Sequence, residues 1–291
     1  MSDNLPATLP KAVKPAQAQY IVNLVRRAAK TEIMPRFRSL ATNDIRIKSH
    51  KNDLVTAADT ATETMISRAL SIAFPEALVI GEESVADAPE QLAQIADAPL
   101  AFIIDPIDGT WNYAHGIAVF GVIIAVTQFG RPVFGLIYDP IADDWAVADE
   151  DSPTRLETAS NVSRPLKASM GKALDALIGY IPLHMFPKAK QPALAAALPG
   201  FARTHPLGCS AHEYRMIAQG HADFLLTGSL HPWDHAAGAL ICERAGAHVE
   251  MLDGGPYSAA RLNGYLLVAP DRTTWNRLKK VFAFLLEEAG Q

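Results

Sequence analysis

The stretch Ala101-Phe-Ile-Ile-Asp-Pro-Ile-Asp-Gly-Thr-Trp-Asn112 decides how this chain is interpreted. It begins with an apolar run that is typical of a buried strand, and the run ends at Asp105. Pro106 has no N–H, so we expect it to end the strand pairing. Asp108 follows one tight turn later, so both carboxylates can point to one place beyond the strand. The stretch therefore predicts a cluster of oxygen ligands at the edge of a sheet.

The residues next to these two aspartates suit a site for a cation and a phosphate group. The carbonyl of Ile107 lies between them in sequence and offers a third oxygen. Gly109 lets the backbone approach a ligand closely, and Thr110 opens a short helical turn whose free N–H groups favour an anion. Carboxylate and carbonyl oxygens beside a phosphate are the environment that Mg²⁺ prefers.

Three more segments place charged side chains where elements are expected to begin or end. They are Lys48 with Asp53-Leu-Val-Thr-Ala-Ala-Asp59, Gly81-Glu82-Glu83-Ser84, and Trp233-Asp234. Four carboxylates around one point repel strongly unless a cation lies among them, and paired divalent ions are the usual means of hydrolysing a phosphate ester. Taken singly, each residue has an ordinary explanation as a turn residue, a helix cap or a surface lysine. Glu83 is interpreted as a solvated neighbour.

The composition bounds the class of protein. The chain has 291 residues, of which 49% are hydrophobic and 20% charged, as in ordinary globular proteins. Its formal net charge of −5 makes a nucleic-acid partner a poor expectation. The longest apolar run, residues 117–127, is far too short to span a membrane. Two distant cysteines, Cys209 and Cys242, predict a reducing, cytoplasmic location rather than a disulfide framework.

Hydrophobic periodicity predicts the order of the elements. Helices are expected over residues 16–34, 59–74, 210–219, 234–245 and 272–289, and strands over 77–80, 101–105, 120–127, 132–138, 145–148, 177–180, 222–226, 247–251 and 265–268. Gly130 and Arg131 mark a hairpin turn. Antiparallel strands first, and alternating strands and helices afterwards, predict a layered α/β fold.

The polar stretch from Asp149 to Pro165 is the best candidate for an internal boundary. We therefore expect three parts. Residues 1–15 form a flexible N-terminal segment, and residues 16–150 form an α+β half with an antiparallel sheet and most metal ligands. Residues 151–291 form an α/β half that carries Asp234 and the substrate-side loop.

Together, the four charged segments resemble the inositol monophosphatase family. Asp105-Pro-Ile-Asp-Gly-Thr-Trp-Asn-Tyr113 is similar to its first signature, and Trp233-Asp-His-Ala-Ala-Gly-Ala-Leu-Ile-Cys-Glu-Arg-Ala-Gly-Ala247 is similar to its second. The resemblance covers roughly residues 16 to 285. It implies a five-layer αβαβα sandwich of the type shared with fructose-1,6-bisphosphatase. It also implies a lithium-sensitive, Mg²⁺-dependent phosphatase that forms a homodimer.

The resemblance assigns the metal ligands residue by residue. Glu82, Asp105 and the Ile107 carbonyl would bind a first Mg²⁺ ion. Asp105, Asp108 and Asp234 would bind a second ion, and a weaker third ion would lie near Glu82. The site would therefore hold two or three ions.

The resemblance also implies which residues act in catalysis. Glu82 and Thr110 would orient or deprotonate the attacking, metal-activated water. Asp59 would keep the Thr110 hydroxyl aimed, and Lys48 would reach the waters of the metal site. The amides of Gly109 and Thr110 would hold the phosphate.

The chain departs from the inositol-specific pattern on the substrate side. Inositol-specific relatives have a glutamate seven residues before the aspartate of the second signature, where it binds sugar hydroxyls, and Thr227 stands there in this chain. The alanine-rich substrate loop of those relatives is Gly208-Cys-Ser-Ala211 here. We therefore expect Asp108, Ser210 and Thr227 on the leaving-group side.

Several substrates stay open at this point. A small phosphorylated metabolite, namely inositol 1-phosphate or a similar sugar or polyol phosphate, is the first candidate. Histidinol phosphate, 3′-phosphoadenosine 5′-phosphate and fructose 1,6-bisphosphate are the alternatives, and Arg203, His212 or Arg215 could favour a differently charged substrate. An alternative of another class is a scaffold of the transcription machinery with residual phosphatase activity.

Overall fold

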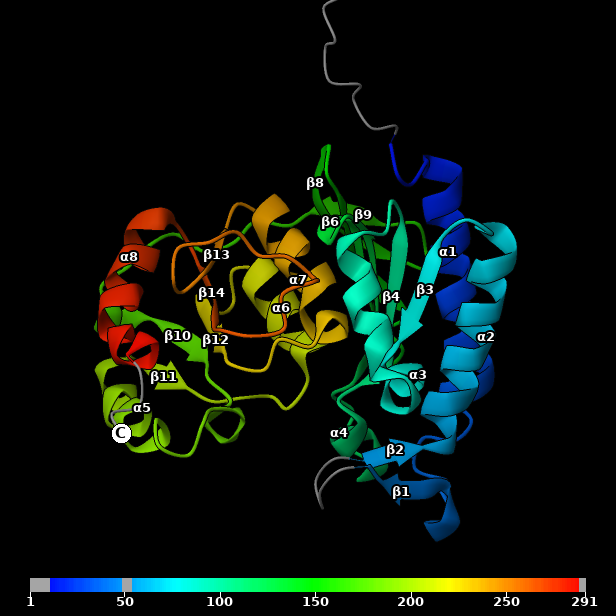
Figure 1. The fold of residues 1–291 in the computed structure, drawn as a ribbon, viewed down its shortest axis with the longest axis horizontal. Coiled ribbons are helices and arrows are strands. Elements are labelled where there is room, and N and C mark those ends of the chain that lie inside the picture. The colour runs from blue at the N-terminus through cyan, green and yellow to red at the C-terminus, as the bar shows by residue number, and fades with distance from the viewer. Residues whose placement is uncertain (1–10, 49–53, 288–291) are drawn as a thin grey trace, which may run out of the picture.

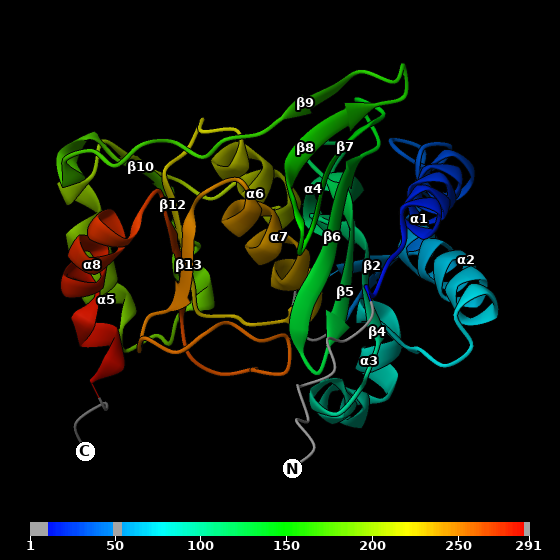
Figure 2. The same ribbon diagram turned by 90° about the horizontal axis from the view of Figure 1, so that it is seen from above.

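A computed structural model of the chain describes residues 11–48 and 54–287. Two large sheets lie roughly face to face with a layer of helices between them, and further helices cover the outer face of each sheet (Figures 1 and 2). The layers therefore follow the order αβαβα, as the resemblance implied. Most of the expected N-terminal segment, residues 1–10, lies outside the described range.

The first sheet has seven strands in chain order, with β3 and β4 parallel and the remaining pairs antiparallel. Its strands are β3 (Leu78–Gly81), β4 (Ala101–Asp108), β5 (Gly121–Gln128), β6 (Arg131–Asp139), β7 (Asp144–Asp149), β8 (Ser152–Thr158) and β9 (Ser163–Pro165). The second sheet has the order β11-β10-β12-β14-β13. Its strands are β10 (Ile178–Tyr180), β11 (Arg203–Thr204), β12 (Phe224–Thr227), β13 (His248–Met251) and β14 (Leu266–Ala269).

The helices and one hairpin complete the fold. The hairpin pairs β1 (Ile45–Ile47) with β2 (Leu54–Thr56). The α-helices are α1 (Pro15–Ala28), α2 (Ala57–Ala73), α3 (Glu82–Asp87), α4 (Thr110–Ala114), α5 (Gln191–Ala197), α6 (Ser210–Ala218), α7 (Pro232–Arg244) and α8 (Arg272–Val281). No helix within residues 11–48 and 54–287 combines the length and the apolar character that crossing a membrane requires.

Helices α1 and α2 cover the outer face of the first sheet (Figure 2). Ile21 and Val25 of α1, and Ile66 and Leu70 of α2, recur at helical spacing and are fully buried in one core with the sheet. A π-helical turn over Ala29–Ile33 prolongs α1. The two helices predicted from the sequence are confirmed.

Helices α6 and α7 form the layer between the two sheets (Figure 1). Helix α7 touches the first sheet on one side and β13 on the other, and ten of its thirteen residues are buried. A helix buried on all sides needs apolar or small residues all round, which explains its run of alanines. On one side it packs so closely that a Cβ added to Gly135 of β6 would lie 2.8 Å from the carbonyl oxygen of Ala237.

Pro106 does not end β4, contrary to the prediction. The register shifts between Asp105 and Asp108, and pairing resumes where Asp108 opposes Gly121 of β5. The missing N–H of Pro106 interrupts the ladder for two residues only, because the neighbouring antiparallel strand continues past it. The resulting irregularity displaces the segment that carries both aspartates.

The polar stretch from Asp149 to Pro165, which was expected to be an internal boundary, is part of the first sheet. Residues 152–158 and 163–165 form β8 and β9, which extend the first sheet. Their side chains are mostly polar because β9 is the edge strand of the sheet, with β8 next to it, and most residues of the two strands are at least partly exposed. The sheet change therefore comes after Pro165. The division of the chain into halves at residue 150 stays a prediction.

The terminal helix is shorter than the prediction of residues 272–289. Helix α8 ends at Val281 and a separate 3₁₀ turn follows over Ala283–Leu286. Helix α7 begins at Pro232, two residues before the predicted start, so Asp234 lies in its first turn and is not its N-cap.

We predict that Gly135→Ala destabilises the fold, because the new methyl group meets the backbone of α7 rather than a movable side chain. Overpacking of this kind costs about 1–3 kcal/mol, which lowers the melting temperature by about 2–4 °C per kcal/mol. Gly200→Ala is the matched control, because nothing lies within 4 Å of a Cβ at Gly200. Equal melting temperatures for the two variants in differential scanning calorimetry would contradict the close packing of α7.

Candidate metal centre

Three carboxylates from two separate elements meet between the two sheets. Oxygens of Asp105, Asp108 and Asp234 all lie within 4.8 Å of one another. The irregular end of β4 supplies the first two, and the first turn of α7 supplies the third. Residues more than 120 positions apart in sequence therefore converge, whereas Glu82, the fourth carboxylate that the sequence placed at this point, is not part of the cluster.

The cluster is buried, and its charges oppose each other. Asp105 is only 1% exposed and Asp108 8% exposed. Burial, followed by the neighbouring carboxylates, raises the pKa of Asp105 well above its usual range. Burial and the charge of Asp234 likewise raise the pKa of Asp108. Burial also acts to raise the pKa of Asp234, but its contact with His231 and the nearby charges of His231 and His235 lower it overall.

Asp105 fits a cation. Its Oδ1 atom is buried and has no hydrogen-bond partner among the described residues. A buried polar atom without a partner is costly, and a cation among three carboxylates would remove both that cost and their repulsion. Oxygen-only donors of this kind suit Mg²⁺ or a similar hard ion better than zinc.

Asp108 is held by the beginning of α6. Its Oδ2 atom accepts hydrogen bonds from the Cys209 thiol at 3.0 Å and from the Ala211 amide at 2.5 Å. Its Oδ1 atom accepts a bond from the Ser210 hydroxyl at 3.0 Å. A carboxylate has room for further ligands, so these three donors fix its direction without excluding a cation. Ser210 therefore contacts the metal centre directly.

Glu82 lines the same cavity but is paired with a lysine. Lys48 Nζ lies 2.8 Å from Glu82 Oε1 and 2.7 Å from Glu83 Oε1. Burial raises the pKa of Glu82 to about 8 and that of Glu83 to about 7, although Lys48 opposes both shifts. The interpretation of Glu83 as a solvated neighbour was wrong, because its side chain is only 11% exposed and shares the lysine.

Glu63, which the sequence analysis missed, fixes the backbone next to Glu82. Its carboxylate accepts hydrogen bonds from the amides of Glu83 at 2.7 Å and Ser84 at 2.9 Å, at the start of α3. A Cβ on Gly81 would lie 2.1 Å from the Glu63 carboxyl carbon, so a larger residue there would displace this carboxylate from the two amides. The signal was present in the sequence, because Glu63 lies four residues after Asp59 on the same face of α2.

Thr110 lies between Asp59 and the Ile107 carbonyl. Its hydroxyl oxygen is 3.1 Å from Asp59 Oδ1 and 2.9 Å from the carbonyl oxygen of Ile107. Burial raises the pKa of Asp59 to about 6, although hydrogen bonds from Thr56 and the charge of Lys48 act against this. The Thr110 hydroxyl thus has a nearby acceptor for its proton.

Gly109 shapes the turn that joins β4 to α4. Its φ of +86° is a left-handed conformation that side chains disfavour. A Cβ there would also lie 2.9 Å from the carbonyl oxygen of Val119. The turn therefore requires glycine, and it precedes the first amides of α4, which an α-helix does not use for its own hydrogen bonds.

The three aspartates, Glu82 and Thr110 line a cavity of about 540 Å³ between the two sheets. Ser210 and Thr227, which the sequence placed on the leaving-group side, both line it. Two residues suggested for a charged substrate point elsewhere. Arg215 is buried against Asp144 and the Ile137 carbonyl, and His212 contacts the Phe120 carbonyl at 3.1 Å. Arg203 lies on β11 and is also absent from the lining.

Asn112, also missed as a functional residue, joins the two halves of the cavity. Its amide nitrogen donates to the carbonyls of Val119, Leu207 and Gly208 at 2.9, 3.0 and 3.2 Å. One side chain of α4 therefore holds the loop that precedes α6. The sequence offered no signal for this contact, since the partners are backbone atoms about 95 residues away.

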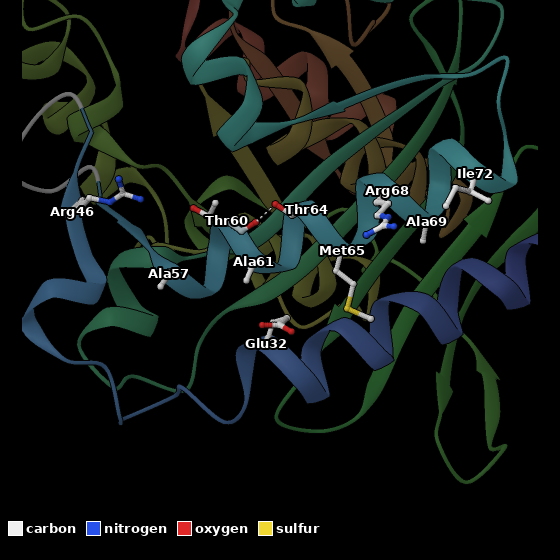
Figure 3. A pocket seen from close by; sticks show the side chains of 10 residues that line it. All are labelled: Glu32, Arg46, Ala57, Thr60, Ala61, Thr64, Met65, Arg68, Ala69 and Ile72. Carbon is white, nitrogen blue, oxygen red and sulfur yellow. Dashed lines mark hydrogen bonds between the residues drawn. The ribbon is translucent and has the colours of Figure 1, made fainter.

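A second cavity, of about 760 Å³, lies on the outer face of α2 (Figure 3). Most of its lining comes from α2, with Glu32 and Arg46 from neighbouring segments. Its only acidic side chain, Glu32, is paired with Arg36. This cavity has no cluster of carboxylates, so it does not compete with the metal centre as a site for a cation.

Comparison with known proteins agrees with this geometry. Residues 16–290 match the inositol monophosphatase family. An inositol-1-monophosphatase of Bacillus subtilis is 29% identical over 214 residues, covering 74% of this chain and 78% of the relative. A protein of Escherichia coli K12 named Nus factor SuhB is 32% identical over 247 residues, covering 81% and 86%. A solved inositol monophosphatase from Zymomonas mobilis superposes with a TM-score of 0.74 at 26% identity, covering 91% and 96%.

We predict that Asp105→Asn stabilises the protein in EDTA. The folded chain holds the pKa of Asp105 above its unfolded value, so at neutral pH this carboxylate opposes folding. Removing its charge should raise the melting temperature by about 3 °C, or about 1 kcal/mol. With Mg²⁺ at about 100 times its Kd, the wild type should gain about 2.7 kcal/mol and the variant much less.

Asp175→Asn is the control for this experiment, because Asp175 is exposed in a 3₁₀ turn. Asp175→Asn should have the melting temperature of the wild type both in EDTA and with Mg²⁺. A lower melting temperature of Asp105→Asn in EDTA would show that the cluster is not strained by its own charge.

Proposed function

We propose that this chain, which belongs to the inositol monophosphatase family and is a phosphoric monoester hydrolase, hydrolyses a small phosphate ester with Mg²⁺ as its cofactor. The observation that carries the proposal is the convergence of Asp105, Asp108 and Asp234 within 4.8 Å beside the glycine turn at Gly109. A bound cation would offset the repulsion in such a cluster, and phosphate esters are substrates that metal-bound clusters of this kind process.

The metal ligands follow from these positions. Asp105 would be shared by two ions, with Glu82 and the Ile107 carbonyl on one side and Asp108 and Asp234 on the other. When bound, Mg²⁺ would supply positive charge that acidifies a water molecule and stabilises the departing oxygen. A weaker third ion near Glu82 completes the proposed set of two or three.

The residues beside the ions handle the proton of the attacking water. Thr110 can donate its hydroxyl proton to Asp59, 3.1 Å away, which leaves its oxygen lone pairs free to accept from the water. Glu82, which lines the same cavity, would be the second acceptor. Lys48, bonded to Glu82 at 2.8 Å, orients that carboxylate.

The glycine turn would hold the phosphate group itself. Gly109 and Thr110 line the cavity at the start of α4, where a helix leaves its first N–H groups available, so their amides would be the donors. They would stabilise the charge that develops on the phosphoryl oxygens during the reaction.

The first substrate candidate is inositol 1-phosphate or a similar sugar or polyol phosphate. The family and the relative from Bacillus subtilis support it. Histidinol phosphate, 3′-phosphoadenosine 5′-phosphate and fructose 1,6-bisphosphate stay alternatives, since Thr227 stands where inositol-specific relatives carry a glutamate. Asp108, Ser210 and Thr227 would face the leaving group. The homodimer and the cytoplasmic location also stay predictions.

A second candidate function rests on one observation, the Escherichia coli relative named Nus factor SuhB. We infer that a binding role in transcription could accompany the hydrolase activity. Co-purification of the chain with RNA polymerase at physiological salt, retained in Asp105→Asn, would support this role, and no co-purification would contradict it.

We predict Mg²⁺-dependent release of phosphate from at least one ester in a panel of the candidate substrates and glycerol 2-phosphate. Li⁺ should inhibit this activity. Asp105→Asn should lower kcat/KM at least about 100-fold, because the shared ligand of two ions is lost. Activity of Asp105→Asn within about tenfold of wild type would contradict a shared ligand. Asp175→Asn again serves as the control.

A further inference from the structure

The two helices of the middle layer each hold part of the metal centre. Helix α7 carries Asp234 in its first turn. The beginning of α6 supplies the Ser210 hydroxyl and the Ala211 amide, which both donate hydrogen bonds to Asp108. The two helices pack against each other (Figure 1). The contacts between them therefore help to set the distance from Asp234 to Asp108.

Tyr214 of α6 is a central residue of this packing. It is fully buried and contacts three residues on one face of α7, which are spaced by three and four positions: His235, Gly238 and Cys242. A Cβ added to Gly238 would lie 2.2 Å from the Tyr214 ring, so the ring lies directly on the backbone of α7. The Cys242 thiol donates to the Tyr214 carbonyl oxygen at 3.6 Å.

The hydroxyl group of Tyr214 reaches the residue next to Asp234. Tyr214 Oη lies 3.0 Å from His235 Nδ1, and His235 Nε2 lies 2.6 Å from the carbonyl oxygen of Ser229. A carbonyl oxygen only accepts hydrogen bonds, so Nε2 carries the ring proton and Nδ1 accepts from the tyrosine hydroxyl. Both ring nitrogens are thus used. His235 is only 4% exposed, so water competes little for these bonds.

These two hydrogen bonds can act on the metal centre through the backbone. The His235 ring is held by α6 on one side and by the segment that leads into α7 on the other, and one peptide bond joins His235 to Asp234. Asp234 has to stay close to two buried carboxylates that repel it. A buried hydrogen bond contributes about two- to tenfold to an equilibrium constant, so it can oppose part of this repulsion.

We propose that Tyr214 and His235 are positioning residues, which hold Asp234 at the distance from Asp108 that a shared divalent cation requires. Tyr214 acts through His235, since it is not part of the cavity lining itself. This inference rests on the proposed function and deepens it, because it names the contact that sets the metal affinity of the site. The hydrogen-bonded pair then stabilises the metal-bound protein more than the metal-free protein.

Tyr214→Phe is the first test, because it keeps the ring on Gly238 and removes only the hydroxyl. The dissociation constant of Mg²⁺, measured by isothermal titration calorimetry, should rise about three- to tenfold, the loss expected for one buried hydrogen bond. Tyr257→Phe is the matched control, since the Tyr257 hydroxyl is also buried but has no hydrogen-bond partner among the described residues. This control should bind Mg²⁺ as the wild type does. Equal dissociation constants for wild type and Tyr214→Phe would overturn the inference.

Melting temperatures separate positioning from a purely structural role. A bond that only stabilises the fold would lower the melting temperature of Tyr214→Phe equally in EDTA and in Mg²⁺. A positioning bond makes the gain on adding Mg²⁺, at about 100 times the wild-type Kd, smaller in the variant than in the wild type. An identical gain in the two proteins would identify a structural bond only and would refute the proposed role.

A double-mutant cycle tests whether Tyr214 acts through His235. His235→Phe removes the acceptor and should raise the dissociation constant of Mg²⁺ by a similar factor. In that background Tyr214→Phe should change the constant by less than about twofold, because the bond is already lost. The full effect of Tyr214→Phe in the His235→Phe protein would show that the hydroxyl acts independently of His235, contrary to the inference.

The inference and the proposed function can fail separately. Mg²⁺ binding without hydrolysis of any ester would refute the proposed function, and the binding data would still decide the role of Tyr214. If no Mg²⁺ were bound, the proposed function would fail, and melting temperatures in EDTA would test the pair. There Asp105→Asn should stabilise Tyr214→Phe less than it stabilises the wild type, since carboxylates that are no longer held together repel each other less. An equal gain in both backgrounds would overturn the inference.

Discussion

The site depends on three carboxylates of like charge that the fold holds close together in a buried position. Asp105, Asp108 and Asp234 would separate if they were free to move, since burial and mutual repulsion raise the pKa of the first two. The fold prevents this by fixing each carboxylate on a rigid element. Two lie on an irregular strand end whose path the sheet determines, and one lies on a helix enclosed between two sheets. The energetic cost of the cluster is the source of its affinity for a cation.

Contacts between the two halves of the chain complete this arrangement. Asp108 belongs to the first sheet, yet its hydrogen-bond donors come from the beginning of α6. Asn112, which follows the same strand, holds the loop that leads into α6. The cavity wall is likewise shared, with Trp111 from one half and Met185 from the other. The metal centre is therefore a property of the closed sandwich and of neither sheet alone.

The sequence predicted most of the elements and the meeting of Asp105, Asp108 and Asp234, because periodicity and acidic residues at element ends are local signals, but it missed β8, β9 and α5. It failed where a strand or side chain that is distant in the sequence determines the local structure. Pro106 was expected to end the strand, yet β4 resumes because the neighbouring strand β5 continues past it. The polar segment after Asp149 was expected to be a boundary, although it forms the last two strands of the first sheet. Glu83 was expected to be solvated because its ion-pair partner, Lys48, lies 35 residues away and no local sequence pattern indicates the contact. The apolar residues that line the cavity, such as Trp111 and Met185, could not be predicted either, because they come from distant parts of the chain.

The crossing from one sheet to the other after Pro165 has a further consequence. A backbone cut in the segment that follows β9 would leave Asp105 and Asp108 on one fragment, and Asp234 with the donors of α6 on the other. Each fragment would keep one complete sheet, but neither would keep a complete set of ligands. A cut at this point would therefore separate the ligands into two fragments. Hydrolysis could reappear only after the two separately expressed fragments reassociate.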